Sequence, residues 1–474
     1  MIMKQSMIGR VKEKLQRCLD LALQKGASSA KAGFVHSDAL SCGYESGRLK
    51  NMGAEEKINC KIEVLVNGKC GRVSGNDMDR LEELVGSAIQ LGKNGSDAHF
   101  EAYPSPSTEP RIQSWSDEVY NLTPEKMIDD CGDIVSRLKD YNEEMDINAG
   151  ASRLENEMLL LTTGGVCHEE KATGWSLGAA VQRTEGTDML FTGFGRSWGD
   201  LNEFYDPSYI VGRVLEDLKQ GERIAESPEG NVPAYLPPEV LQQFLRVFEI
   251  GVNGRSVAKG ESPLRGKLGQ QVLAPEMTVV DNPHRPFSPS AAAVDDDGVP
   301  TRELTLFDQG VLKHFLYDLD TAGLVGEEPT GHNNCQPYEL MINPGDRPSE
   351  ELLADIEDGI YIKHLLGFGQ SNIVNGDFSA NVGLGYRVRN GRIEGRVKNR
   401  CQLSRFLLRL EQPDKSYPIR VHPGIGKCLN RLISSILHRI IDLSLSRLQC
   451  DSGERQQQSK RQHTTSRRAQ SSTC

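Results

Sequence analysis

His168-Glu169-Glu170 begins like a zinc-binding helix. A zinc hydrolase helix needs two histidines one turn apart, so that both imidazoles face one metal ion while the glutamate acts as the base. Four and five residues after His168 stand Ala172 and Thr173, and the next histidine is His284. We therefore expect an exposed turn here and no metal site.

Clustered carboxylates at Asp295-Asp296-Asp297-Gly298 could hold a hard cation such as Ca²⁺ or Mg²⁺. Their spacing differs from the alternating ligand positions of an EF-hand loop, so a solvated turn is the expectation. Two glycine pairs, Gly367-Phe368-Gly369 and Gly383-Leu384-Gly385, lack the third glycine and the strand–helix placement of a dinucleotide fingerprint. We interpret them as tight turns or close backbone approaches.

A thiol activated by an imidazole is the other hydrolytic chemistry that the residues suggest. Cys167 precedes His168, and Cys335 follows His332 by three positions, but neighbours in sequence need not face each other. We assign no nucleophile elbow, although the Gly-x-Ser-x-Gly pattern occurs at Gly174–Gly178 and at Gly195–Gly199. The residues by themselves name no reaction, and we assign no catalytic, cofactor-binding or metal-binding residue.

Composition indicates a folded protein in a reducing compartment. The chain has 474 residues, enough for two or three domains, and its 37% hydrophobic and 26% charged residues favour a packed core over disorder. Eleven scattered cysteines without a Cys-x-x-Cys pair indicate reduced thiols. We find no secretory signal and no apolar run long enough to span a membrane, so we expect a cytoplasmic protein.

The net charge of −11 divides unevenly along the chain. Residues 399–474 hold 14 Lys/Arg and 5 Asp/Glu, whereas residues 1–398 hold 41 and 61. An acidic body argues against nucleic acid as the main partner, because phosphate binding needs clustered positive charge. Only the basic tail could supply that charge, although such tails are usually solvated and this one has few aromatic residues for base stacking.

Hydrophobic periodicity predicts a mixture of helices and strands, an α+β fold class. Helices are expected at Ile8–Lys25, from a cap at Asp77 to Leu91, after Thr123-Pro124, after Asp206-Pro207, after Leu236-Pro237-Pro238, and at Ser349–Asp358. Strands are expected at Lys31–His36, at Ile58–Val66 before an Asn67-Gly68 turn, in a meander over Arg153–Phe194, and across Leu264–Asn399.

These elements predict two domains and a tail. The N-terminal α/β domain spans residues 1–225, with an αββα-like block in the first 95 residues and a connector near residues 100–120. A strand-rich C-terminal domain spans residues 226–399. Residues 400–474 form a basic, low-complexity tail that we expect to be poorly ordered, with an amphipathic helix possible at Cys428–Leu448.

Five segments stand in a fixed order through the second half of the chain. They are Gly254-Arg255-Ser256 with Leu264–Val272; Asp296–Arg302 with Gly310–Lys313 and Phe315–Asp318; Thr330-Gly331-His332; Pro344-Gly345-Asp346 through Leu365-Leu366-Gly367; and Asn375–Ser379 with Gly395–Asn399. One such motif is weak, but five in register are specific. Their order and spacing resemble the TldD/PmbA family, and more closely its PmbA-like members, over roughly residues 10–399.

The resemblance implies an N-terminal α/β domain, a strand-rich C-terminal domain, and a dimer that encloses an inner chamber. TldD-type members carry His-Glu-x-x-x-His on a helix just before the segment that matches Gly254–Gly269, and they act as zinc peptidases on unfolded or small peptides. PmbA-type partners lack these ligands. The matching helix here, Gln242–Asn253, has no histidine, and its Glu249 is expected at the surface or the core edge. Zinc is therefore expected only in a TldD-type partner.

The end of the chain departs from the family. After Gly395–Asn399 the family continues through a short strand and a final helix, whereas this chain continues with Arg400-Cys401-Gln402 and the basic tail. We hypothesise a reading-frame change or a gene fusion near Asn399, with the loss of the last structural element.

Three functions remain open on the sequence. The first is a non-zinc subunit of a metallopeptidase complex, a homodimer or a heterodimer with a TldD-type subunit, that grips peptide backbones along exposed strand edges. The second is a self-sufficient hydrolase with an unrecognised site. The third is a regulatory binding protein that modulates DNA gyrase or an antitoxin, as a name used for the family suggests. Membranes are not expected as partners.

Overall fold

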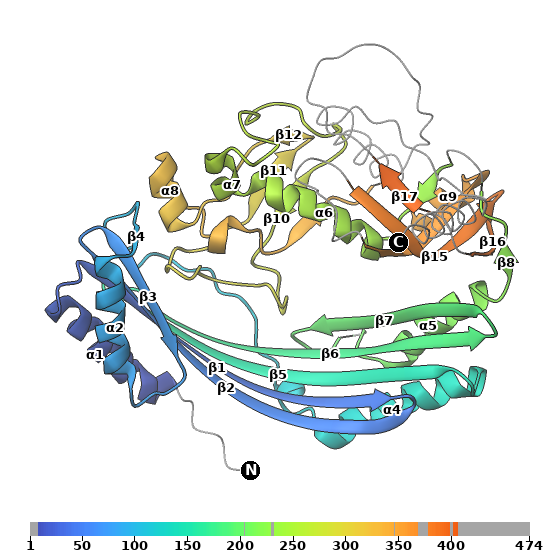
Figure 1. Cartoon of the computed structure of the whole chain (residues 1–474), viewed down its shortest axis with the longest axis horizontal. Coiled ribbons are helices and arrows are strands. Elements are labelled where there is room, and N and C mark those ends of the chain that lie inside the picture. Colours follow the sequence, from blue (N-terminus) through green and yellow to red (C-terminus); the bar gives the residue numbers. More distant parts are fainter. Residues whose placement is uncertain are drawn as a thin grey trace, which may run out of the picture.

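A curved, seven-stranded antiparallel sheet forms the base of the molecule (Figure 1). The computed structural model describes residues 8–202, 204–228, 232–345, 347–367, 378–398 and 402–405. The strands in spatial order are β4 (Ser96–Asp97), β3 (Lys69–Gly75), β2 (Arg48–Val66), β1 (Ser29–Glu45), β5 (Asp146–Thr162), β6 (Cys167–Glu185) and β7 (Asp188–Trp198). The concave side of the sheet faces the C-terminal part of the chain.

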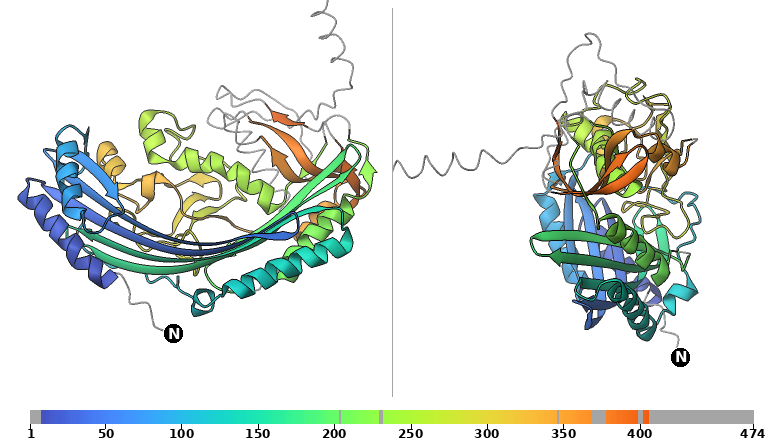
Figure 2. Two further views of the ribbon diagram at one scale, coloured as in Figure 1. Left: turned by 60° about the horizontal axis from the view of Figure 1, so that its bottom comes forward. Right: turned by 90° about the vertical axis from the view of Figure 1, so that its right-hand side faces the viewer.

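Helices cover both ends of the convex face (Figures 1 and 2). At one end lie α1 (Ile8–Gln24) and α2 (Leu81–Lys93), and at the other lie α4 (Pro124–Tyr141) and α5 (Pro207–Gln220). Between them runs a connector that includes α3 (Asp117–Tyr120). Strand β5 shows how one pattern serves both ends: its alternate residues Ile147 and Ala149 pack in one core cluster, and Leu159 and Leu161 pack in the other.

The predicted αββα block of residues 1–95 is not a separate unit. β1 pairs with β2 on one side and with β5 on the other, so the first three strands belong to the large sheet. The expected strands at Lys31–His36 and Ile58–Val66 are parts of strands of 17 and 19 residues. Their remaining halves are rich in Ser, Gly, Asn and Glu, residues of low strand propensity, and only pairing with neighbours makes them strands.

Local signals were mostly confirmed. The α1 helix ends before Gly26, whose φ is +95°, and Thr123 caps α4 by accepting the N–H of Lys126 at 3.2 Å. The Asp77 cap is wrong: α2 begins at Leu81, and Asp77 accepts the N–H of Asp79 instead. The predicted Ser349–Asp358 helix is shorter, because the chain leaves the helix at once to begin the strand at Asp358.

The C-terminal part consists of two smaller sheets and short helices. Its helices are α6 (Pro238–Val252), α7 (Gly254–Lys259), α8 (Leu319–Val325), the 3-10 turn at Asn333–Cys335, and α9 (Ser349–Ala354). One sheet has the order β12 (Val311–Leu312), β11 (Leu304–Asp308), β10 (Val279–Asp281), β13 (Leu340–Ile342). The other has the order β8 (Ile224–Ala225), β16 (Arg392–Val397), β15 (Phe378–Arg389), β14 (Asp358–Leu366), β9 (Ala234–Tyr235). α6 packs between these sheets through Phe244, Phe248 and Val252.

The second small sheet continues past residue 399. Strand β17 (Gln402–Arg405) pairs antiparallel with β15, from Phe378–Arg405 to Asn381–Gln402. The predicted helix at Cys428–Leu448, like the low-complexity end of the tail, lies outside the described residues. Among the described helices, none is both long and apolar enough to cross a membrane.

Candidate functional site

Helix α6 lies where the family resemblance places the zinc helix. Phe248 on its inner face packs edge-on against Phe307 at 5.3 Å between ring centroids, while Gln242 and Arg246 are exposed. Glu249 is half-buried, as expected of a core-edge residue, and desolvation raises the pKa of its carboxyl group. The described residues include no group of three or more His, Cys, Asp or Glu side chains that could hold a metal ion. One carboxylate does not fit a zinc hydrolase.

His168 is not in an exposed turn, so that prediction is wrong. It lies on β6 and is 5% exposed, because the connector covers this part of the strand. Its Nδ1 is 2.7 Å from a Glu109 carboxylate oxygen, and its Nε2 is 3.3 Å from Glu170. Burial alone would lower the pKa of His168, but the bonds to Glu170 and Glu109 outweigh it and raise the pKa. Cys167 is exposed, on the opposite face of the strand from its neighbour, so no thiol–imidazole pair forms.

His332 and Cys335 are both completely buried, and each has its own partners. The His332 Nε2 is 2.7 Å from an Asp281 carboxylate oxygen, and its Nδ1 is 2.9 Å from the Thr330 hydroxyl. The Cys335 sulfur accepts the backbone N–H of Asp318 at 3.3 Å, and burial raises the pKa of the thiol. These contacts describe a packed core and not a nucleophile with its base.

The Asp295–Gly298 turn is only partly solvated, which corrects the expected solvated turn: Asp295 and Gly298 are buried, Asp297 is half-buried and Asp296 is exposed. Asp295 is 2% exposed, and a bridge between Val294 and Pro300 closes the turn around it. Asp297 forms an ion pair with Lys31 of β1. The cluster around this contact, which we call the Lys31 junction, consists of Lys31, Glu63, Arg72, Tyr103, Asp295 and Asp297.

Glu63 continues the Lys31 junction into the sheet. Lys31 Nζ is 3.6 Å from a Glu63 oxygen, Arg72 donates to both Glu63 oxygens at 2.7 and 3.1 Å, and the Tyr103 hydroxyl donates to Glu63 at 2.9 Å. The sequence did not single out these residues. Lys31 sits between Ala30 and Ala32 in a strand pattern, where an outward lysine is normally a solvated one.

Asp295 carries an unusual carboxyl group. One oxygen accepts the N–H groups of Asp297 and Val299, each at 2.9 Å. The other oxygen has no hydrogen-bond partner within the described residues, and neither has the buried hydroxyl of Tyr338. Desolvation, with the nearby charge of Asp297, raises the pKa of Asp295 to about 7.

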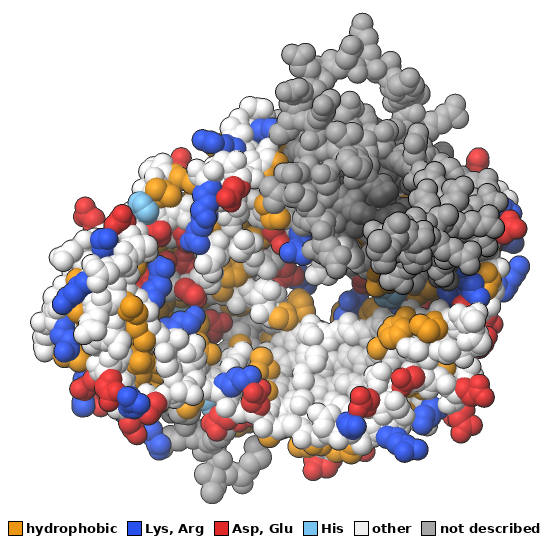
Figure 3. Space-filling view, in the orientation of Figure 1, with side chains coloured by type: hydrophobic (Ala, Val, Ile, Leu, Met, Phe, Trp, Pro, Cys, Tyr) orange, Lys and Arg blue, Asp and Glu red, His pale blue; other side chains and the backbone are white. Residues whose placement is uncertain are grey.

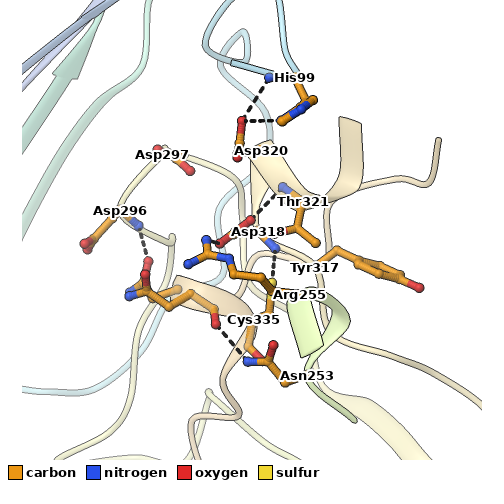
Figure 4. A network of polar contacts seen from close by, with 12 residues as sticks. His99, Asn253, Arg255, Asp296, Asp297, Tyr317, Asp318, Asp320, Thr321 and Cys335 are labelled. Atoms are coloured by element: carbon orange, nitrogen blue, oxygen red, sulfur yellow. Dashed lines mark hydrogen bonds and ion pairs between the residues drawn. The ribbon is translucent and has the colours of Figure 1, made fainter. Parts of the chain in front are cut away.

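A polar network links the turn to the Gly254-Arg255-Ser256 motif (Figure 4). The Asp296 N–H donates to Asn333 at 2.6 Å, and the Asn253 amide donates to the Cys335 carbonyl at 2.9 Å. Arg255 binds Asp318 at 2.5 Å, and Asp318 caps α8. The first two contacts join a side chain to the backbone, and the Arg255–Asp318 contact joins two side chains. The network therefore positions elements, and it offers no nucleophile to a substrate.

A second cluster holds the other end of the C-terminal part. This Asp188 junction consists of Asp188, Asp217, Lys363, Arg396 and Lys398. Arg396 donates to both Asp188 oxygens at 2.6 and 2.7 Å, and Lys398 lies 3.2 Å from Asp188. Lys363 of β14 is 3.0 Å from Asp217 of α5.

The concave face of the sheet is hollowed, with a volume of about 470 Å³ where small residues line it. Cross-strand pairs put Gly43, Gly150, Gly178 and Gly195 in one row over four strands, and Ser41, Ser152, Ser176 and Ser197 in the next. Few coloured side chains lie over the middle of the sheet in Figure 3. A surface with so few protruding side chains can accept a chain of varied sequence.

Known proteins resemble this chain along most of its length. A model described as the PmbA/TldA metallopeptidase C-terminal domain matches residues 229–407. A metalloprotease of Synechocystis sp. is 32% identical over 407 residues, covering 79% of this chain and 84% of that protein. The structure of a candidate modulator of DNA gyrase from Thermotoga maritima is 25% identical, with a TM-score of 0.75 over 82% of this chain and 90% of its own. TldE from Thermococcus kodakarensis, at 18% identity, has a TM-score of 0.76 over 82% of this chain and 91% of its own, so the α+β fold is shared. The five motifs, the fold and these relatives agree, and the chain belongs to the TldD/PmbA family.

Proposed function

We propose that this chain is the non-zinc subunit of a peptidase complex that acts on unfolded or small peptides together with a zinc-bearing, TldD-type subunit. Helix α6 carries the proposal. The resemblance places the family's zinc helix here, yet α6 contains no histidine, and the polar side chains along it include Gln242, Arg246 and Glu249. A guanidinium group and an amide do not bind zinc in proteins, and Glu249 alone cannot hold it.

The curved sheet supports a role as a chamber wall. Its concave face has rows of glycine and serine, so a peptide passing over it meets few side chains that would select a sequence. The ion pairs at the Lys31 and Asp188 junctions hold the C-terminal part over this face. In a complex, such a wall would confine an extended chain beside the partner's zinc.

The test is to purify the chain alone and measure bound zinc by elemental analysis. We expect below about a tenth of an equivalent, because a structural or catalytic zinc site needs three or four protein ligands. Hydrolysis of an unfolded peptide should be absent for the isolated chain and present after a TldD-type subunit is added. Near-stoichiometric zinc with hydrolysis by the chain alone would identify a self-sufficient hydrolase instead.

A regulatory role is the second candidate, supported by the similarity to the Thermotoga maritima structure described as a candidate modulator of DNA gyrase. Pull-down of gyrase by this chain, with and without a TldD-type subunit, separates the two. Capture of gyrase that competes with the TldD-type subunit would favour regulation over proteolysis.

A further inference from the structure

Strand β7 is an unusual edge. Apart from it, each described edge strand has two to four residues: β4, β8, β9, β12, β13 and β17. Short edge strands protect a sheet from pairing with other chains. β7 has 11 residues and pairs with β6 alone in its sheet. It is therefore a long open edge of the described part of the molecule; the other is Arg48–Asn59 of β2, which pairs with β1 alone but carries the edge-protecting charges Arg48, Lys50 and Lys57.

The hairpin geometry shows which groups β7 presents. A two-residue turn, Gly186-Thr187, joins it to β6, so Asp188 and Glu185 form a hydrogen-bonded pair. The backbone N–H and C=O groups of the next residue, Met189, therefore point away from β6. Arg396 does donate to the Met189 carbonyl at 3.2 Å. Every second residue after Met189 has the same direction, and these are Phe191, Gly193, Gly195 and Ser197. Their outward N–H and C=O groups have no hydrogen-bond partner among the described residues.

The usual protections of an edge strand are missing between Phe191 and Ser197. The pairing of β6 with β7 has no register shift, and this stretch contains neither proline nor lysine. Its single charge, Arg196, stacks on Phe194 at 4.6 Å and approaches Glu239 of α6 at 3.5 Å. The stretch spans roughly 20 Å, the length of a six- or seven-residue extended segment.

Large apolar side chains line one end of this edge on the concave face, and glycines follow them along the strand. Met189 and Phe191 are 59% and 57% exposed on the concave face, and orange side chains gather there in Figure 3. Gly193 and Gly195 follow on the same face, where the hollow begins. An added strand would place alternate side chains on this face, one against Phe191 and the next over the glycines.

We propose that β7 binds an extended peptide as an added strand, main chain to main chain, with one side chain of the peptide beside Phe191 and a large apolar side chain over Gly195. The proposal rests on the proposed function as a peptide-handling subunit and defines its substrate class. Backbone hydrogen bonds give affinity for any extended sequence, and the glycine floor gives a preference at one position.

Binding is tested with the isolated chain and a fluorescent seven-residue peptide of alternating threonine and valine with a central phenylalanine. We expect Phe191→Lys to weaken the dissociation constant about tenfold or more, since it adds a charge to the edge. Leu91→Lys is the matched control, because Leu91 is 54% exposed on α2, on the convex side, and it should leave binding unchanged. A peptide N-methylated at alternate residues should lose binding.

The preference is tested with Gly195→Val. A Cβ atom at Gly195 would lie 3.4 Å from the Leu177 carbonyl oxygen and 3.5 Å from Gly178 Cα, which are ordinary contacts, so the variant should fold. It should weaken the binding of the phenylalanine peptide about tenfold and leave the binding of an alanine analogue almost unchanged. Equal affinity of wild type and Phe191→Lys, or of methylated and unmethylated peptide, would overturn the proposal, as would a β7-dependent dimer of the chain that excludes peptide.

The outcome for β7 is separate from that for the proposed function. If Phe191→Lys binds the peptide like wild type and still supports hydrolysis with a TldD-type subunit, the edge site is wrong and the subunit role stands. If the wild-type chain neither joins nor supports such a subunit, the subunit role is wrong whatever β7 binds.

Discussion

The two junctions that join the C-terminal part to the large sheet balance buried charge in opposite ways. The Lys31 junction has three carboxylates and two cations, and the Asp188 junction has two carboxylates and three cations. At the first, desolvation raises the pKa of Asp295 to about 7. At the second, desolvation is outweighed by hydrogen bonds from Arg396 and Lys398, which lower the pKa of Asp188. The Lys31 junction thus contains a carboxyl group, Asp295, whose pKa is raised, whereas the pKa of Asp188 in the other junction is lowered.

The largest expected effect comes from Lys31→Met. It leaves Asp297 and Glu63 in a buried place without the cation that lies between them, so we expect a loss of about 3–5 kcal/mol in the free energy of unfolding, measured by urea denaturation. Lys12→Met is the control, because the Lys12–Glu169 pair is exposed and should change stability by less than about 1 kcal/mol. Equal losses for the two variants would show that the Lys31 junction is not a buried ion cluster.

The next largest effect is the pH dependence of stability, which should differ between the two junctions. The folded state holds the Asp295 proton up to about pH 7, while the unfolded state releases it near 3.8, so this group makes stability fall as pH rises between those values. The slope is at most about 1.4 kcal/mol per pH unit. Asp295→Asn, which keeps the acceptor oxygen, should remove this slope in denaturation curves at pH 5 and 7.5. A variant that keeps the slope would place the proton elsewhere.

Asp188→Asn should show the opposite sign. The lowered pKa of Asp188 means that its contribution is present above the unfolded pKa and is lost as pH falls through the folded value. Since Asp188 still faces Arg396 and Lys398, we expect a loss of roughly 1–3 kcal/mol at pH 7 that shrinks in acid. Thermal unfolding at pH 7 and pH 3.5 measures it, and a loss that grows in acid would contradict the comparison.

The smallest expected effects on stability come from removing the hydroxyl group of either of two tyrosines near the junctions. The Tyr386 hydroxyl donates to the Asp217 carbonyl at 2.9 Å, so Tyr386→Phe should cost about 1 kcal/mol. The buried Tyr338 hydroxyl, near Asp295, has no partner among the described residues, so Tyr338→Phe should be neutral or slightly stabilising. Differential scanning calorimetry compares the pair. A large loss for Tyr338→Phe would reveal a buried water that bridges to Asp295.

Local order could be read from the sequence, whereas long-range order could not. The α1 stripe and the Thr123-Pro124 start were correct because each depends on residues within one or two helical turns. The pairing of β1 with β5 was not predicted, because paired residues such as Lys31 and Thr162 are far apart in the sequence and come together only in the folded sheet. Asp295 was expected in water because a run of aspartates is normally exposed, and only the docking of that turn on β1 buries it. The absence of zinc from this chain and the domain boundaries at residues 225 and 399 stay predictions.

The β1–β5 pairing also sets the order in which the molecule can be made. β1 leaves the ribosome about a hundred residues before its neighbour β5, and during that interval it can pair only with β2. Such distant contacts slow folding, and an unfilled strand edge on a nascent chain invites association with other chains. We therefore expect the yield of folded chain during synthesis to depend on chaperones until residue 162 has emerged and β5 can pair with β1.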